Sequence, residues 1–212
     1  MTSPRVAARP LALLLGFVLL LLAPAAHAES GIIKHPGQHP NYPFELEPHV
    51  LAQYDRTPYT NGGFGIGARV AIPFVHNGPI PQINNNIGIS FGADFVHFGT
   101  DRYCSYGRGW DYYYTYTDGC SATDLWFPVT AQWNFFLTPI ISVFGELGLS
   151  AHYTRWSYDG VCNDAPCSNS ASHLDLFEPV IFAGGRFMFA RSVGLMVRLG
   201  WPYVSVGAAF WF

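Results

Sequence analysis

Charged residues that could do chemistry occur at alternating positions within apolar segments of this chain. Five are acidic and three are basic, and together they form the candidate charge network: Glu45, Glu47, Asp94, Glu146, Glu178, Arg69, Arg186 and Arg198. Carboxylates beside guanidinium groups can transfer protons or form ion pairs. No nucleophile accompanies them in a motif that we recognise, so we expect no catalytic residue and no enzymatic activity.

The segments that carry these charges alternate between apolar side chains and small or polar ones. In the segment 63–75, Phe64 and Ile66 share one parity, whereas Gly65 and Arg69 share the other. Such period-two alternation is typical of β-strands whose two faces meet different surroundings. Eight segments of this kind define the predicted strands: 44–54, 63–75, 87–98, 124–135, 140–153, 176–189, 193–200 and 203–212.

The lengths of the connections predict how these strands are arranged. The connections 136–139 and 190–192 are short, whereas 99–123 and 154–175 are long. Outer-membrane barrels have short periplasmic turns and longer external loops. We therefore predict an all-β protein, a closed antiparallel transmembrane β-barrel of eight strands with both termini on the periplasmic side.

Three prolines lie inside predicted strands, namely Pro48, Pro128 and Pro179. A proline cannot donate a hydrogen bond to the ladder of a sheet. We expect β-bulges at these positions, because a bulge accommodates a residue without a ladder partner.

The candidate charge network lies on the inward parity of the predicted strands. The interior of an eight-stranded barrel is just wide enough for side chains to fill. Charges held there must pair, because an isolated buried charge is very costly. The simplest interpretation is a plug of ion pairs, and the alternative is a porin-like gated pore or proton path through the same residues.

Four cysteines lie in the two long connections. Cysteines of exported proteins generally form disulfides, because the surroundings are oxidising. We therefore expect disulfides that pair Cys104 with Cys120 and Cys162 with Cys167. The sequence leaves the other connectivities open. A metal site built from four thiols is a weaker hypothesis, since neither spacing resembles that of a zinc-binding pair.

The connection 99–123 is unusually rich in aromatic residues. Tyr and Trp can anchor an interface at low entropic cost, so one interpretation is a surface that binds a glycan, a phage or another cell. The other is that the flanking strands extend above the membrane as a hairpin with aromatics near the interface. The candidate surface-loop residues are Tyr103, Tyr106, Trp110, Tyr112, Tyr113, Tyr114 and Tyr116.

We predict no metal site and no cofactor. His35, His39 and His49 lie close in sequence, but the first two belong to a Pro-rich stretch without fixed geometry. An outer-face hydrolase would need Ser, His and an acid grouped near one rim. His97 is an outward-facing histidine without such companions on its face.

The beginning of the chain has the features of a secretory signal peptide. Arg5 and Arg9 precede an apolar run over 11–22, and small residues surround His27 at the expected cleavage site. The apolar run is too short to span ~30 Å of hydrocarbon. The predicted organisation is a signal peptide (1–28), a flexible periplasmic lead-in (29–43) and an outer-membrane barrel domain (44–212).

Composition argues against nucleic acid as a partner. Removal of the signal peptide lowers the 11 basic residues to 9, against 14 acidic ones, so the mature chain is acidic. Charged residues are only 12% of the chain, whereas a soluble domain carries about 25%. A soluble exported barrel with a ligand cavity would need a polar exterior, which the alternation does not provide.

The last ten residues alternate as a strand and end on Phe212. Their spacing resembles the C-terminal assembly signal of bacterial outer-membrane barrels, carried here by Ser205, Gly207, Phe210 and Phe212. This resemblance implies recognition by the barrel-assembly machinery and closure of the last strand against the first.

At the level of architecture, most of the mature chain resembles the small eight-stranded outer-membrane barrels of the OmpA/OmpX type. Three blocks also resemble poorly characterised Gram-negative outer-membrane barrels: Ile83–Ile89, Gln132–Phe136 and Val143–Glu146. The resemblance implies a place in the outer membrane, in contact with lipid, but no particular activity. We expect a structural or adhesive role at the cell surface, carried by the external loops and an extracellular ligand, with the narrow channel as the alternative.

Overall fold

The computed structural model describes residues 31–54, 62–106, 113–162 and 165–212, with the side chains of 99–120, 158–169 and 171 outside the description. Residues 32–212 form one compact unit. The predicted signal peptide lies outside the described residues. Within the described part of the chain, no helix is both long and apolar enough to cross a membrane.

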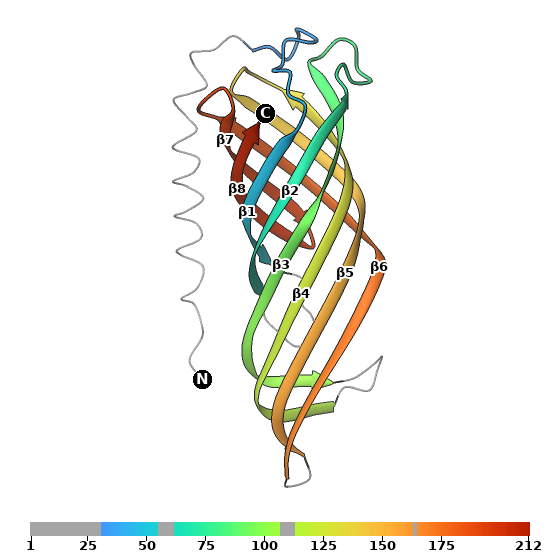
Figure 1. Ribbon diagram of the computed structural model, residues 1–212, viewed down its shortest axis with the longest axis vertical. Coiled ribbons are helices and arrows are strands. Elements are labelled where there is room, and N and C mark those ends of the chain that lie inside the picture. The colour runs from blue at the N-terminus through green and yellow to red at the C-terminus, as the bar shows by residue number, and fades with distance from the viewer. Residues whose placement is uncertain (1–30, 55–61, 107–112, 163–164) are drawn as a thin grey trace, which may run out of the picture. The chain divides into compact units, whose positions relative to one another are not determined.

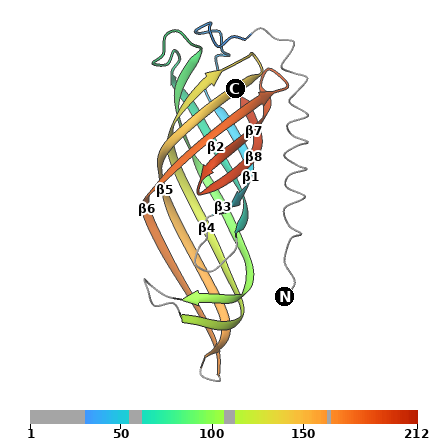
Figure 2. The ribbon, with the colours of Figure 1, turned by 180° about the vertical axis from the view of Figure 1, so that it is seen from behind.

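Eight antiparallel strands form this unit. They are β1 (Glu45–Gln53), β2 (Gly63–Val75), β3 (Asn85–Tyr106), β4 (Tyr113–Phe136), β5 (Ile141–Cys162), β6 (Ala165–Met188), β7 (Val193–Trp201) and β8 (Tyr203–Trp211). Each strand pairs with the next, and β1 also pairs with β8, so the sheet closes into a barrel (Figures 1 and 2). The predicted closed antiparallel barrel of eight strands is confirmed.

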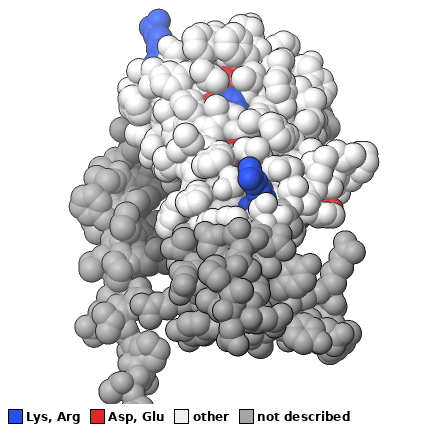
Figure 3. All heavy atoms as spheres, turned by 60° about the horizontal axis from the view of Figure 1, so that its bottom comes forward, with Lys and Arg blue, Asp and Glu red and all other residues white. Residues whose placement is uncertain are grey.

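The alternation seen in the sequence separates the two faces of the barrel wall. On β2, Phe64 and Ile66 are 78% and 66% exposed on the outside, whereas Arg69 is 1% exposed on the inside. Large apolar side chains are exposed along the other strands as well, among them Val50, Phe91, Val129, Leu147, Ile181, Leu199 and Val206. Charged residues are few on the described surface of the face drawn in Figure 3. The outer wall is therefore apolar and the inner wall polar.

The strands differ greatly in length. β1, β7 and β8 have 9 residues each, whereas β3 to β6 have 22 to 24. The pairing of β6 with β7 begins only at Ile181, opposite Trp201, so the first part of β6 has no neighbour on that side. The surplus lengths form a four-stranded extension beyond the closed barrel (Figure 1). We call this extension the projecting sheet, comprising 99–106, 113–123, 154–162 and 165–175.

The projecting sheet corrects the prediction of two long loops. Most of 99–123 and 154–175 is strand, because β3 pairs with β4 as far as Tyr106 and Tyr113, and β5 pairs with β6 as far as Cys162 and Ala165. The alternative hypothesis, that the flanking strands extend as a hairpin, is confirmed for the backbone.

The residues ahead of β1 pack against one end of the barrel. Ile32 N–H donates to the carbonyl of Leu137 at 3.0 Å, and the ring of Tyr42 stacks on Trp211 at 4.8 Å between centroids. Both Ile32 and Tyr42 are buried. Residues 32–43 of the expected lead-in therefore pack against the barrel, because apolar side chains in this Pro-rich stretch join a buried cluster. The flexibility of 29–43 stays a prediction.

The prolines do not all produce the expected bulges. The register passes Pro48 and Pro128 without a shift, and only Pro179 lies beside one, where β5 and β6 change register between Ser150 and His152. A proline removes only its own donor, and the loss of one ladder bond does not require an inserted residue.

Closure of the barrel depends on a small residue at the seam between β1 and β8. Gly207 lies opposite His49, and a Cβ atom there would come within 2.3 Å of the Pro48 carbonyl oxygen. We expect Gly207→Val to destabilise the folded barrel by about 1–3 kcal/mol, the usual effect of overpacking. Heat-modifiable gel migration after refolding measures the folded fraction. Ala208→Val, one residue along on the opposite face, is the control, and equal folded fractions would contradict the prediction.

Candidate functional site

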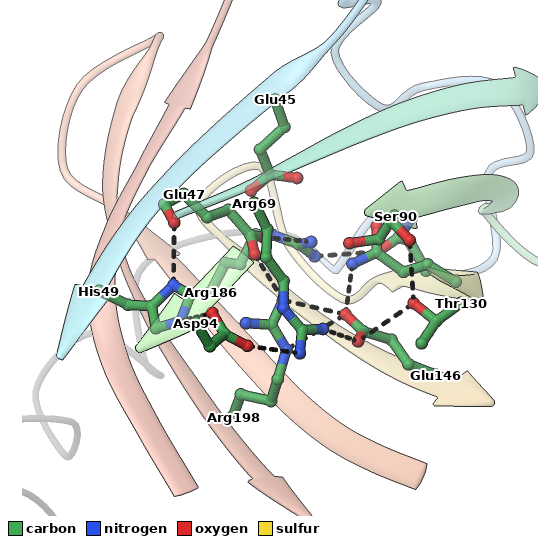
Figure 4. A network of polar contacts seen from close by, with 12 residues as sticks. Glu45, Glu47, His49, Arg69, Ser90, Asp94, Thr130, Glu146, Arg186 and Arg198 are labelled. Carbon is green, nitrogen blue, oxygen red and sulfur yellow. Dashed lines mark hydrogen bonds and ion pairs between the residues drawn. The ribbon is translucent and has the colours of Figure 1, made fainter. Parts of the chain in front are cut away.

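The lumen of the barrel contains most of the candidate charge network (Figure 4). Seven of its eight predicted members are at most 3% exposed: Glu45, Glu47, Arg69, Asp94, Glu146, Arg186 and Arg198. They come from six different strands, β1, β2, β3, β5, β6 and β7. The closed sheet brings them together because all occupy the inward parity of their strands.

One half of the network connects β1 to β5 through two arginines. Arg186 donates to Glu45 and, at 3.1 Å, to Glu47. Arg198 donates to the other oxygen of Glu47 and, at 3.0 Å, to Glu146. Each guanidinium thus bridges two carboxylates, the arrangement that low dielectric surroundings favour most strongly.

The other half continues from Glu146 to β3 and β1. Arg69 donates to Glu146 at 2.9 Å and to the Tyr203 hydroxyl at 2.6 Å, and it lies 3.4 Å from Asp94. The Tyr203 hydroxyl donates to Asp94. His49 Nε2 is 2.8 Å from the other oxygen of Asp94, so this carboxylate contacts Arg69, Tyr203 and His49.

The sequence analysis did not assign several partners that complete the network. Tyr203 bridges Arg69 and Asp94, and Gln132 donates to Glu146 at 2.8 Å. The Arg186 guanidinium lies 4.2 Å from the centre of the Phe144 ring, within the range of a cation–π contact. Their inward parity was a usable signal, but parity alone does not show which inward residues touch.

Apolar clusters enclose the network at both ends. The cluster at the projecting end includes Phe98, Trp126 and Tyr203, all at most 1% exposed. The cluster at the other end includes Tyr42 and Trp211. Burial, and to a smaller extent nearby carboxylates, raise the pKa of Tyr42 to about 12, so its hydroxyl stays neutral at physiological pH. The described side chains thus form a plug with an apolar lid on each side.

Glu178 does not belong to this plug, which corrects its predicted place in the network. It lies beyond the lid, where His152 Nδ1 is 3.1 Å from its Oε2. Val180 and Phe182, the next inward residues of β6, are buried in the lid itself. The lid therefore separates Glu178 from the arginines.

One motif that the sequence analysis missed is Gly88-Ile89-Ser90-Phe91-Gly92. It has the Gly-x-Ser-x-Gly spacing of a nucleophile elbow, which requires a sharp turn from a strand into a helix. Here the motif lies inside β3, and Ser90 is buried in the barrel wall opposite Thr130. The spacing arises because small residues alternate on the inward face, so it does not form an elbow.

The histidines near the mature N-terminus are not brought together. His49 contacts Asp94 in the lumen, whereas His39 Nδ1 is 2.6 Å from Asn84 Oδ1 at the end that the lead-in covers. His35 is exposed. These three side chains therefore do not meet at one place in the structure.

The cysteines and the candidate surface-loop residues have no described side chains. In the backbone register Cys104 lies opposite Thr115 and Cys120 opposite Asp101, while Cys162 lies opposite Ala165. The disulfide pairing therefore stays a prediction. Trp110 and Tyr112 lie outside the described residues, and the backbone of β3 and β4 carries the remaining members: Tyr103, Tyr106, Tyr113, Tyr114 and Tyr116.

Comparison with solved structures matches the chain to two crystal structures of Ail, the attachment invasion locus protein of Yersinia pestis. One of them is a complex with the heparin analogue sucrose octasulfate. Each match has a TM-score of 0.43 and 14% sequence identity, and covers 80% of this chain and 96% of that chain. No protein-family model matches the sequence, and no curated protein matches it.

The plug predicts a strong dependence of stability on its central arginine. Arg198→Met leaves Glu47 and Glu146 buried without their shared cation, so we expect a loss of about 3–5 kcal/mol in the free energy of unfolding. Urea unfolding of the refolded barrel, followed by tryptophan fluorescence, measures this change. Arg191→Met, at an exposed arginine in the β6–β7 turn, should change it by less than ~0.5 kcal/mol. Similar losses in the two variants would show that the plug does not hold the barrel together.

Proposed function

We propose that this chain is an integral outer-membrane β-barrel with a plugged lumen, which presents the projecting sheet outside the cell as a surface for binding other macromolecules. The observation that carries the proposal is the difference in strand length around the barrel. The predicted signal peptide and C-terminal assembly signal support export and insertion.

The outer wall matches the thickness of a membrane. On β2, outward residues run from Phe64 to Phe74, ten residues along the strand. At about 3.3 Å per residue this length is ~33 Å, and a strand tilt of about 40° reduces it to a height of ~25 Å. Outer-membrane barrels carry an apolar band of about this height.

The long strands extend well beyond such a band. A tilted strand needs about 9–11 residues to cross a bilayer. β1, β7 and β8 have 9 residues each, which is just enough. β3 to β6, at 22 to 24 residues, are about twice as long as the crossing requires. Their surplus lies at the end opposite the turns that join β4 to β5 and β6 to β7. In outer-membrane barrels the end with the longer connections faces the exterior.

The projecting sheet has open edges that suit it for binding. Residues 165–180 of β6 have no β7 neighbour in the register. An unpaired edge offers backbone N–H and C=O groups that can add a strand from another chain. The projecting sheet leaves backbone N–H and C=O groups at its edges unpaired within the sheet, whereas a closed barrel would pair them. This exposure favours a role in binding another molecule.

The enclosed plug supports a barrel that does not conduct, against the alternative of a gated channel. We expect no steady conductance from the refolded protein in a planar bilayer, because paired charges and two apolar lids leave ions no continuous polar route. Recordings beside Arg69→Ala and Glu146→Ala test this point. Steady channels in the wild-type protein whose conductance changes in these variants would favour the channel instead.

The interaction surface is tested by shortening the projecting sheet. In the shortened variant, Asn-Gly turns replace 101–118 and 158–169, since these two residues suit a tight hairpin. We expect cells producing the wild-type protein to be retained on immobilised glycans or extracellular matrix, and retention by the shortened variant to fall to the level of cells without the protein.

Two controls accompany this experiment. Heat-modifiable migration must show that both barrels are folded. An epitope in the β5–β6 connection should bind antibody on intact cells, whereas the same epitope in the turn 190–192 should bind only after permeabilisation. If cells producing either folded protein are retained equally, the projecting sheet is not the binding surface. If the epitope in the turn 190–192 is accessible on intact cells and the one in the β5–β6 connection is not, the proposed orientation is wrong.

A further inference from the structure

Three side chains with metal-binding atoms converge at the base of the projecting sheet. The imidazole of His152 and the carboxylates of Asp175 and Glu178 each offer one ligand atom, and these atoms lie within 4.8 Å of one another. The group lies beyond the apolar lid, where the side chain of Asp175 is 51% exposed and that of Glu178 is 27% exposed. The site is therefore open to solvent, unlike the plug.

The register shift beside Pro179 creates this convergence. Ser150 lies opposite Glu178 and His152 opposite Asp175, so β5 advances by two residues while β6 advances by three. In a regular strand, residues three apart point to opposite faces. The extra residue in β6 re-aims the chain, as bulges commonly do, and brings both carboxylates to the face that carries His152.

The imidazole of His152 is held in a fixed orientation. Its ring stacks on the buried indole of Trp126, with 3.6 Å between centroids and 7° between planes. Its Nε2 lies 2.9 Å from Thr154 Oγ1 and 3.2 Å from Asp124 Oδ2, and Gln53 Nε2 donates to the same Asp124 oxygen at 3.2 Å. The ring therefore presents its other nitrogen, Nδ1, toward Glu178.

Asp124 occupies the position that a carboxylate takes behind a metal-bound histidine. Such histidines almost always donate their second ring N–H to a carboxylate or carbonyl, which fixes the tautomer and makes the ligating nitrogen more basic. Asp124 is 0% exposed, and its Oδ1 accepts no hydrogen bond from the described residues. Its Oδ2 is thus turned toward His152, and among the described side chains none of the three plug arginines contacts it.

We propose that His152 Nδ1 and one carboxylate oxygen each from Asp175 and Glu178 bind a divalent transition-metal ion of the Zn²⁺ class. One imidazole and two carboxylates are ligands that such ions accept, at about 2.0–2.2 Å. In the tetrahedral arrangement that Zn²⁺ prefers, those bond lengths put ligand atoms about 3.4 Å from each other. The exposed Asp175 side chain, which His173 Nε2 approaches at 3.0 Å, has the freedom to close the remaining gap.

An ion at this position would link two strands and could also bind a further ligand. It bridges β5 and β6 where their ladder is interrupted, a few residues from the point at which β6 loses β7. It therefore stiffens the junction between the barrel and the projecting sheet. Three protein ligands also leave a coordination position open toward solvent, where a donor from another molecule can bind.

Titration calorimetry with Zn²⁺ alone tests the proposal on the refolded full-length mature chain in detergent, with free thiols alkylated. We expect one ion per chain, and at least tenfold weaker binding in Asp175→Asn and in Glu178→Gln. These substitutions keep the side-chain shape and leave the His152–Trp126 stack in place, so the barrel should fold. His97→Gln, at an exposed histidine of β3, is the control and should bind as the wild type does.

Three results would overturn the site. One is the absence of Zn²⁺ binding by folded wild-type protein up to millimolar concentration. Another is unchanged binding in both carboxylate variants, and the third is an equal loss in His97→Gln. Because purified protein in detergent is used, none of these outcomes depends on whether the projecting sheet binds macromolecules on cells.

Discussion

The structure depends on the pairing of charges that the closed barrel buries away from bulk solvent. Four carboxylates and three arginines converge from six strands, and each arginine bridges two acids. Such a network stabilises only the closed barrel, because opening one seam separates partners that are costly to leave unpaired. The network therefore links the stability of the six strands that contribute to it.

A second constraint is the mismatch between the short and long strands. In a bilayer, β1, β7 and β8 are just long enough to cross, while the other half of the wall continues as an open sheet. The apolar lid at Trp126 and Tyr203 marks the level at which the interior changes from enclosed to open. Above this level His152 of β5 and Glu178 of β6 are partly exposed, so these polar groups can contact solvent, unlike the residues of the plug.

The alternation of side chains was enough to predict the strands, the closed barrel and the inward residues. β2 was predicted at its observed ends, and seven charges lie in the lumen as expected. The outer ends of β3 to β6 were missed because the apolar–polar alternation is weak there, and turn-forming and polar residues such as Asp118 and Gly119 suggest loops. Glu178 has the correct parity, but a residue's height in the barrel depends on strand tilt and register, which the local sequence does not specify.

By itself, the sequence determined which residues face inward and which face outward, because strand geometry imposes a period of two on any chain with an apolar outer wall. Only the tertiary structure decided which inward residues meet. Arg186 reaches Glu45 across 141 positions of sequence, and the extra residue beside Pro179 turns Asp175 toward His152. Both facts follow from barrel closure and from one register shift, and these depend on the pairing of whole strands.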